Sequence, residues 1–341
     1  MRNHQVTVPH KLLNPDGSLK EPGWSKSLVQ AYDRRDIKKR KTRIKEWDYY
    51  YIMSNSNNLA LCLTVSDLGY IALHSINFIS FAEPFEKTQT VILPFPMGKT
   101  GMPSTSARGD VKFKNKKLAI EFLHKGSSRV IRMESPEFDG KKGIRCNIVL
   151  TDEPQDSMVI ATPWADDKKA FYYNQKINCM RASGKVEYDG KVYELDPSVD
   201  FAGLDWGRGV WTYDNVWYWG SGSGQVDGHT FGFNIGYGFG DTSAASENVI
   251  FYDGVAHKID DVTFNISDNF VDPWTFTSSD GRFEMSFEPI IDRNALIDLK
   301  VILTDQHQVF GRMTGTAVLD DGTKVQIKDF LCFAEKVHNK Y

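Results

Sequence analysis

A hairpin sequence occurs twice in this chain, and the repeat limits the possible folds more than any other feature. The copies cover residues 181–190 and 312–322. Each starts with Arg-x-Ser/Thr-Gly and ends in an Asp-Gly turn. Each return strand then reaches an Asp-Phe pair, at residues 200–201 and 329–330. Asp-Gly between alternating segments predicts a tight hairpin. The starts of the copies are 131 residues apart, which suits one closed antiparallel barrel of about eight strands per copy. The alternative is a chance similarity between two Asp-Gly hairpins.

The rest of the chain has the pattern of an all-β protein. From Trp47 onward, short β-branched and aromatic segments alternate with turn signals, and no long segment has the 3.6-residue period of a helix. Aromatic residues make up 13% of the 341 residues, and 27 glycines favour strands and tight turns. We therefore expect two tandem antiparallel β-barrels, in residues 47–206 and 207–341, after an extended basic N-terminal arm in residues 1–46.

The arm contains the main concentration of charge. Residues 33–45 include eight basic and two acidic side chains. Such a segment suits phosphate groups or an acidic surface, but charge runs are more often solvated, and Ile37, Ile44 and Trp47 suit an edge that leads into the fold. The formal net charge of the whole chain is -3, which gives no broad field for nucleic acid. We expect no nucleic-acid partner.

Other sequence signals indicate the cellular compartment and whether a metal or cofactor is expected. The N-terminus lacks the apolar core of a signal peptide, and no run approaches the roughly 18 apolar residues of a spanning helix. We therefore expect a cytoplasmic protein with no integral membrane segment. Histidine spacing predicts no metal site, and no phosphate loop or dinucleotide motif predicts a cofactor. The cysteines, which form no Cys-x-x-Cys pair, are expected to be reduced and mostly buried; they are Cys62, Cys146, Cys179 and Cys332.

Residues 205–219 join the two repeat units and hold four of the eight tryptophans. Crevices between domains are preferred places for ligands, so this stretch is the best candidate site. We expect it to act together with polar residues of the strand that follows. The predicted ligand-binding residues are Trp206, Arg208, Trp211, Tyr213, Trp217, Trp219, Asn234 and Tyr237.

Residues 230–240 predict a strand with two very different faces. Phenylalanine, isoleucine and tyrosine occupy one face, and glycine occupies most of the other. A face made of glycine indicates that something bulky lies against the backbone. It is either a ligand or neighbouring side chains such as Trp217 and Trp219. Both readings remain open at this point.

Asp205 and Glu247 are the candidate catalytic residues. A carboxyl group in an apolar cavity can donate a proton, whereas a nearby arginine favours the carboxylate. If Asp205 pairs with Arg208, the pair is a structural lock between the barrels. If Arg208 faces a cavity instead, it anchors a ligand carboxylate or phosphate. Glu247, at the head of an apolar strand, is the second candidate acid, and an exposed strand edge is its alternative setting.

Several motifs together resemble one family. They are Leu-Asp-Trp-Gly-Arg-Gly-Val-Trp at 204–211, Trp-Tyr-Trp-Gly-Ser-Gly at 217–222, Glu-Asn at 247–248, Phe-Gly-Arg-Met-Thr-Gly at 310–315 and Phe-Ala-Glu-Lys-Val-His-Asn at 333–339. The chain resembles the bacterial domain-of-unknown-function family 2804 over nearly its whole length. That family is similar, more distantly, to the two-barrel lipocalin-like group of carotenoid hydratases, tocopherol cyclase and fungal Diels-Alderase-type cyclases. The resemblance implies two lipocalin-like, calycin-type barrels with an apolar cavity, and acid-assisted chemistry on isoprenoid- or lipid-like substrates. We carry no catalytic residue of those enzymes over to a position in this chain.

Two functional hypotheses follow. The first is a protein that binds an apolar or amphipathic small molecule, lipid- or isoprenoid-like, in a barrel or between the barrels. The second is an enzyme, a hydratase, cyclase or isomerase that uses Asp205 or Glu247 as a general acid. A purely structural module is a third reading, favoured if side chains fill the barrel interiors.

Overall fold

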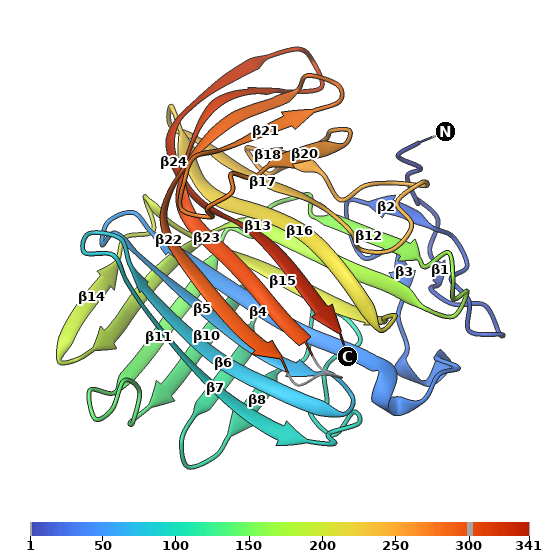
Figure 1. The fold of residues 1–341 in the computed structure, drawn as a ribbon, viewed down its shortest axis with the longest axis horizontal. Helices are drawn as coiled ribbons and strands as arrows, with labels where there is room; N and C mark the ends of the chain where they lie inside the picture. The colour runs from blue at the N-terminus through green and yellow to red at the C-terminus, as the bar shows by residue number, and fades with distance from the viewer. Residues whose placement is uncertain (1, 299–302, 341) are drawn as a thin grey trace.

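The computed structural model describes residues 2–298 and 303–340 and consists almost entirely of strands (Figure 1). The prediction of an all-β protein is confirmed. Two single helical turns, η1 (Arg34–Asp36) and η2 (Lys41–Arg43), precede the first long strand. Three short strands lie in the N-terminal arm, β1 (His10–Lys11), β2 (Gly23–Ser25) and β3 (Gln30–Ala31). In the part of the chain described, no helix is long and apolar enough to span a membrane.

The first of two large sheets has thirteen strands. Its main path, in order, is β7 (Phe85–Pro94), β6 (Ile71–Ser80), β5 (Leu59–Asp67), β4 (Ile44–Ser54), β15 (Asp200–Val210), β13 (Phe171–Tyr188), β11 (Ile144–Thr151), β10 (Ser128–Ser135), β9 (Ala119–Lys125) and β8 (Val111–Lys114). Strands β12 (Met158–Pro163) and β14 (Lys191–Leu195) pair with β13, and β2 pairs with β12. The sheet curls until its ends approach, and Ser135 Oγ donates to Gln89 Oε1 of β7 at 2.9 Å.

The second sheet has nine strands. Their order is β19 (Val255–Lys258), β18 (Val249–Tyr252), β17 (His229–Tyr237), β16 (Asp214–Val226), β24 (Lys324–Lys340), β23 (Leu303–Val318), β22 (Phe283–Asp298), β21 (Trp274–Ser278) and β20 (Val262–Asn265). It also curls, which brings β17 near β20. The chain thus forms two tandem, barrel-like antiparallel units, as the sequence predicted.

The two repeat copies occupy corresponding hairpins. The first forms β13 and β14, and the second forms β23 and β24. In both, the phenylalanine of the Asp-Phe pair lies opposite the start of the repeat, Phe201 opposite Arg181 and Phe330 opposite Met313. The chain changes sheets between Val210 and the start of β16, a few residues after the expected division at 206 and 207, which lies inside β15.

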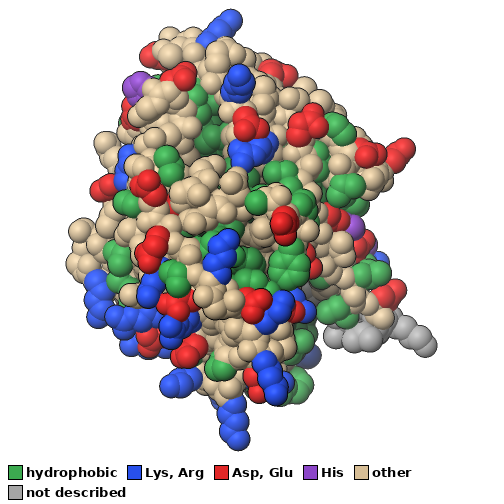
Figure 2. All heavy atoms as spheres, turned by 90° about the vertical axis from the view of Figure 1, so that its left-hand side faces the viewer, with side chains coloured by type: hydrophobic (Ala, Val, Ile, Leu, Met, Phe, Trp, Pro, Cys, Tyr) green, Lys and Arg blue, Asp and Glu red, His purple; other side chains and the backbone are tan. Residues whose placement is uncertain are grey.

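The N-terminal arm packs onto both units. Trp24 of β2 lies opposite Ile160 of β12, while the backbone N–H of His4 donates to Ala244 O at 2.8 Å. Part of its positive charge is matched within the protein. Lys39 pairs with Asp167 at 2.5 Å. Figure 2 shows acidic and basic side chains interspersed over one face of the molecule, with a group of basic side chains at its lower left.

Strand β13 contains a β-bulge, where the register with β15 shifts between Ile177 and Met180. Cys179, inside the bulge, has a φ of 63°. The bulge makes close polar contact with the second sheet, because Asn178 Nδ2 lies 2.9 Å from Ser221 Oγ and the backbone N–H of Cys179 donates to Ser223 Oγ at 2.9 Å.

Three apolar cores follow from the alternation of side chains along the strands. One fills the first unit, one fills the second, and one lies between the two sheets. On β4, for example, Tyr50 and Ile52 point into the first unit, and Tyr49, Tyr51 and Met53 point between the sheets.

Candidate functional site

The layer between the two sheets gathers both predicted acids. Alternate residues of β4, β13 and β15 enter it from the first sheet, and alternate residues of β16, β17 and β24 enter it from the second. Three acidic side chains and one lysine in this layer are almost completely buried. We call them the inter-sheet cluster: Lys176, Asp205, Glu247 and Glu335.

Lys176 and Asp205 form an ion pair at the centre of the cluster. They lie opposite each other on β13 and β15, with Lys176 Nζ 3.0 Å from Asp205 Oδ1. Asn174 Nδ2 donates to the same oxygen at 2.5 Å. The ammonium group also lies 4.0 Å from the ring centre of Trp219, which belongs to the second sheet. The ion pair therefore links the two sheets through a cation–π contact.

The two glutamates lie at opposite ends of a row of residues that runs across neighbouring strands of the second sheet. The strand register aligns Glu335 of β24 with Trp219 of β16 and Gly236 of β17. Beyond Gly236 comes the carboxyl group of Glu247, since a β-carbon at Gly236 would lie 2.5 Å from Glu247 Oε1. Lys176, above the central Trp219, lowers the pKa of both glutamates, whereas Asp205 raises it.

Both oxygens of Glu335 are held by the protein. Trp217 Nε1 donates to Oε1 at 3.0 Å, and Gln308 Nε2 donates to Oε2 at 3.0 Å. Burial raises the pKa of Glu335 to about 7, against the hydrogen bond from Trp217 and the positive charges of Arg293 and Lys176. Glu335 is thus fixed in place.

Glu247 is held at only one of its oxygens. Tyr172 Oη donates to Oε2 over a long 3.5 Å, and Oε1 has no hydrogen-bond partner among the residues described. Burial raises the pKa of Glu247 to about 7, against the charge of Lys176. A carboxyl group with this pKa carries a proton in a substantial fraction of molecules at neutral pH.

A small hollow of about 10 Å³ lies beside Glu247. Its walls include Tyr172, Tyr237, Phe239 and Thr242. This volume is near the minimum for one water molecule, which also needs polar partners. The carboxyl group of Glu247 is one such partner.

Aromatic rings enclose the cluster on the side of Glu247. Tyr172 lies between two nearly parallel rings, with Phe239 at 4.7 Å and 13° and Trp47 at 6.2 Å and 21° between centroids and planes. Trp211 meets Tyr172 edge-on at 5.9 Å and Trp217 at 5.2 Å. This aromatic wall shields the acids from water and gives them a low-dielectric setting.

The glycine face of β17 packs against the protein itself. A β-carbon at Gly232 would lie 2.5 Å from the sulfur of Cys179, across the layer between the sheets. At Gly236 it would meet the Glu247 carboxyl group. Of the two readings of this face, neighbouring side chains therefore account for these two positions, and the neighbours are a cysteine and a glutamate.

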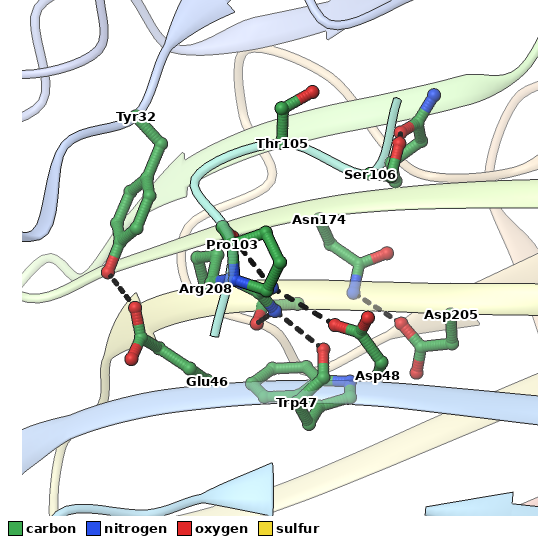
Figure 3. A network of polar contacts seen from close by, with 12 residues as sticks. Tyr32, Glu46, Trp47, Asp48, Pro103, Thr105, Ser106, Asn174, Asp205 and Arg208 are labelled. Carbon is green, nitrogen blue, oxygen red and sulfur yellow. Dashed lines mark hydrogen bonds and ion pairs between the residues drawn. The ribbon is translucent and has the colours of Figure 1, made fainter. Parts of the chain in front are cut away.

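Arg208 does not pair with Asp205, so the first of the two settings considered for it, an ion pair between the barrels, does not occur. Its side chain points into the first unit, where Nη2 donates to Asp48 Oδ1 at 3.0 Å and to Pro103 O at 2.9 Å (Figure 3). Figure 3 also shows Asp205 joined to Asn174 instead. The reason is geometric: positions 205 and 208 differ by three, and residues an odd number apart on a regular strand face opposite sides. Arg208 holds the loop at residues 99–109 against the first unit.

The other predicted residues divide between the two sides of the sheets. Trp206 belongs to the core of the first unit. Tyr213 lies in the connection between β15 and β16, and its side chain is 47% exposed. Trp211, Trp217, Trp219 and Asn234 do face the inter-sheet layer, where Trp219 Nε1 donates to Asn234 Oδ1 at 2.7 Å. Tyr237 lies at the hollow and also stacks on Tyr218 at 4.5 Å.

The sequence interpretation missed three residues of the site, Tyr172, Lys176 and Glu335. For β13 a signal was present, because Tyr172, Asn174 and Lys176 alternate with the apolar Phe171, Tyr173 and Ile177. A polar face on a buried strand indicates a second buried polar layer. Glu335 had no comparable local signal, being a single acid in an apolar segment.

Other chemical groups were also located. All four cysteines are buried and free, as predicted. In residues 2–298 and 303–340, no group of three or more histidine, cysteine or acidic side chains is arranged to hold a metal ion.

A much larger groove, of about 850 Å³, lies on the outer face of β8, β9, β10, β11 and β13. Charged side chains line most of it, and several pair with each other; Arg145, for example, pairs with Glu187 at 2.5 Å. The groove lies outside the layer between the sheets, and none of its lining residues belongs to the inter-sheet cluster.

Comparison with known proteins places the chain in a family and supports its fold. The chain belongs to the family described as Domain of unknown function (DUF2804), whose model matches residues 3–341. No curated protein matches the sequence.

Among solved structures, an AttH-type protein from Nitrosomonas europaea has 11% identity and a TM-score of 0.55, over 91% of this chain and 97% of that one. Kievitone hydratase from Nectria haematococca has 8% identity and a TM-score of 0.46, over 97% and 98% of the two chains. CghA has 11% identity and a TM-score of 0.45, over 98% and 97%. The similarity to the Nitrosomonas europaea protein supports the two-unit fold and nothing about function.

Proposed function

We propose that the layer between the sheets holds an acid–base catalytic site in which Glu247 donates a proton to a small, mostly apolar, unsaturated molecule. One observation carries this proposal: Glu247 is a buried carboxyl group with a free oxygen, a raised pKa of about 7 and a hollow beside it. A general acid works best when its pKa is near the working pH. An ordinary surface glutamate is ionised at neutral pH and has no proton to give.

The neighbours of Glu247 have supporting roles. Tyr172 Oη orients one carboxyl oxygen and leaves the other available. Asp205 is held in its ion pair with Lys176, and a paired carboxylate is a poor proton donor. Glu335 has a similar pKa, but its oxygens are engaged by Trp217 and Gln308. Of the two acids predicted from the sequence, Glu247 is therefore the better candidate.

The chemistry of such a site is proton addition to a carbon–carbon double bond. The Glu247 O–H bond breaks, a C–H bond forms from the π electrons, and a carbocation remains next to the new C–H bond. If water adds its oxygen to the cation and returns a proton to the Glu247 carboxylate, the product is a hydrate. If a neighbouring carbon loses a proton to the carboxylate, the product is an isomer. Either way, the acid is regenerated.

The aromatic wall suits a reaction with a cationic intermediate. The π faces of tryptophan and tyrosine attract positive charge, most strongly where water is excluded. Tyr172, Trp211 and Trp217 surround the Glu247 side of the cluster. These rings would lower the energy of a carbocation formed beside Glu247.

Isotope incorporation tests the proposal without a known substrate. The full-length protein is incubated in D₂O or H₂¹⁸O with a panel of uncharged alkenols and enones, and products are analysed by mass spectrometry. Deuterium without ¹⁸O indicates isomerisation, and both labels together indicate hydration. We expect Glu247→Gln to abolish incorporation, with Glu335→Gln as the matched control for loss of a buried acid. Incorporation that persists undiminished in Glu247→Gln would exclude Glu247 as the acid.

A binding protein is the second candidate, because an enclosed aromatic layer can also hold a small apolar molecule without changing it. Lipid extraction and native mass spectrometry of gently purified protein distinguish the two readings. A bound, chemically unaltered molecule, together with no isotope incorporation across the panel, favours binding over catalysis.

A further inference from the structure

Residues 238–246, which lead from β17 to Glu247, form a cover over the hollow. Gly238 and Gly240 both have φ in the left-handed region, at 95° and 79°, and between them the ring of Phe239 turns inward onto Tyr172. Hydrogen bonds hold this cover to β12 and to the N-terminal arm. Thr162 Oγ1 donates to Phe239 O at 2.5 Å, and the backbone N–H of His4 donates to Ala244 O at 2.8 Å.

Phe239 is the outer ring of a three-ring stack, with Tyr172 in the middle and Trp47 behind it. It is 6% exposed and forms one wall of the 10 Å³ hollow beside Glu247. If this one ring leaves, a flat slot opens against the face of Tyr172. The slot has the shape of an aromatic or conjugated ring, and it lies next to the available oxygen of Glu247.

Three buried polar atoms around Tyr172 have no hydrogen-bond partner within the described chain: Trp211 Nε1, Asn174 Oδ1 and Glu247 Oε1. Asn174 follows Tyr172 by two positions on the same face of β13, and Trp211 meets the Tyr172 ring edge-on. A buried polar atom without a partner costs free energy. The indole N–H requires an acceptor, and the amide oxygen requires a donor.

We propose that this slot takes a flat, uncharged ring that bears a hydroxyl group and displaces Phe239; the hydroxyl accepts a hydrogen bond from Trp211 Nε1 and donates one to Asn174 Oδ1. The proposal rests on the proposed function, because it names the substrate class for the Glu247 site. Three carboxyl groups already share the cluster with one lysine, so an anion is disfavoured there. An ammonium group is disfavoured too, because it offers no acceptor to Trp211 and Lys176 already supplies the cation of the layer.

Four probes that share one flat ring system separate these requirements: 2-naphthol, naphthalene, 2-naphthoate and 2-naphthylmethylammonium. Their affinities are measured at neutral pH by equilibrium dialysis against the full-length protein. The Phe239→Ala variant opens the slot, and Phe264→Ala, in the core of the second unit, is the control for loss of a buried phenylalanine. Thr162→Val releases the cover without removing the ring and serves as a second opening variant if Phe239→Ala folds poorly.

We expect Phe239→Ala to bind 2-naphthol about tenfold more tightly than the wild type or Phe264→Ala does, and about tenfold more tightly than either ion. Naphthalene should bind about fivefold more weakly than 2-naphthol, and Trp211→Phe in the opened variant should reduce that difference, because one of the two hydrogen bonds of the hydroxyl is lost. Equal binding by the opened and control variants, or binding of either ion as tight as that of 2-naphthol, overturns the proposal.

These experiments distinguish a failure of the proposed binding slot from a failure of the proposed acid catalysis. The double variant Phe239→Ala/Glu247→Gln has no acid but keeps the slot, so it should still prefer 2-naphthol. If it does and no isotope enters any panel compound with the wild-type protein, the slot stands and the proposed acid catalysis falls. If isotope enters with the wild type but 2-naphthol shows no preference for the opened variants, the catalysis stands and the slot falls.

Discussion

The ammonium group of Lys176 lies 4.0 Å from the centre of the Trp219 indole ring, so a charge on the first sheet rests on an aromatic face of the second. The same ammonium is paired with Asp205 at 3.0 Å. Glu335 and Glu247 stand on either side of Trp219 along the second sheet. One lysine therefore acts on three carboxyl groups, and the ionisation of the site depends on the contact between the sheets.

Replacing Lys176 with methionine tests this dependence. The change leaves Asp205 buried without its partner, which should cost about 3–5 kcal/mol of unfolding free energy. Asp205→Asn in the same chain should recover most of that loss, because no charge remains unpaired. Denaturant unfolding of the single and double variants measures the coupling. A double variant no more stable than Lys176→Met would contradict the ion pair as the cause.

Lys176→Met should also change the two glutamates. Because Lys176 lowers the pKa of Glu247 and Glu335, its removal should raise both values above about 7. Carboxyl ¹³C NMR with labelled glutamate follows these titrations directly. Lys185→Met, an exposed lysine on β13 outside the layer, is the control and should leave both titrations unchanged.

The buried glutamates predict a definite dependence of stability on pH. Their pKa is about 7 in the folded protein, against an ordinary value of 4.5 for glutamate. Between these values the native state keeps a proton that the unfolded state has lost. The unfolding free energy should therefore fall by about 1.4 kcal/mol per pH unit for each group and level off above about pH 7.

Glu247→Gln should remove one of these two contributions, so its stability should decline less steeply with pH than that of the wild type. Denaturant unfolding at several pH values from about 5 to about 8 gives the slope. The double variant with Glu335→Gln should be flatter again. An unchanged slope in both variants would show that these acids are ionised normally in the folded protein.

Gly236→Ala tests the space that the Glu247 carboxyl group occupies. The added β-carbon would lie 2.5 Å from Glu247 Oε1 and 2.7 Å from Tyr218 O, so we expect a loss of about 1–3 kcal/mol in unfolding free energy. Gly220→Ala is the control, since its nearest neighbour, the Ile235 side chain at 3.1 Å, can yield. Equal stability losses in the two variants would argue against a crowded carboxyl group.

Arg208→Lys should destabilise the first unit and leave the acid site unchanged. Lysine cannot reproduce the forked contacts of Arg208 with Asp48 and Pro103, so a loss of about 2 kcal/mol or more is expected. Hydrogen exchange should increase at residues 99–109. A shifted Glu247 titration in this variant would instead bring Arg208 back into the site.

The sequence predicted the architecture because its signals are local. The repeated Asp-Gly hairpins and the alternation of residues 230–240 depend on neighbours along the chain, and both are strands in the structure. Asp205 and Glu247 could be identified as acids in apolar surroundings. Their convergence with Lys176 and Glu335 could not, because it depends on how two sheets approach each other.

Arg208 illustrates a residue whose orientation the sequence interpretation left open. Its closeness to Asp205 in sequence suggested a pair, but on an extended strand the side chains three positions apart diverge. The acid that it does meet, Asp48, comes from the neighbouring strand β4. The same alternation applied to β13 would have placed Tyr172, Asn174 and Lys176 on one face and pointed to the polar layer.

The bulge at Asn178 and Cys179 determines which residues of β13 can belong to the site. Before it, even-numbered residues such as Lys176 face the second sheet; after it, even-numbered residues such as Ala182 and Val186 face the interior of the first unit. The bulge thus reverses which residues of β13, odd-numbered or even-numbered, face the second sheet. Deleting one residue there would turn the side chains on one side of the bulge to the opposite face, so that either the site residues or the core residues of the hairpin would point the wrong way. Relatives that align without a gap at this position should therefore share the same polar face.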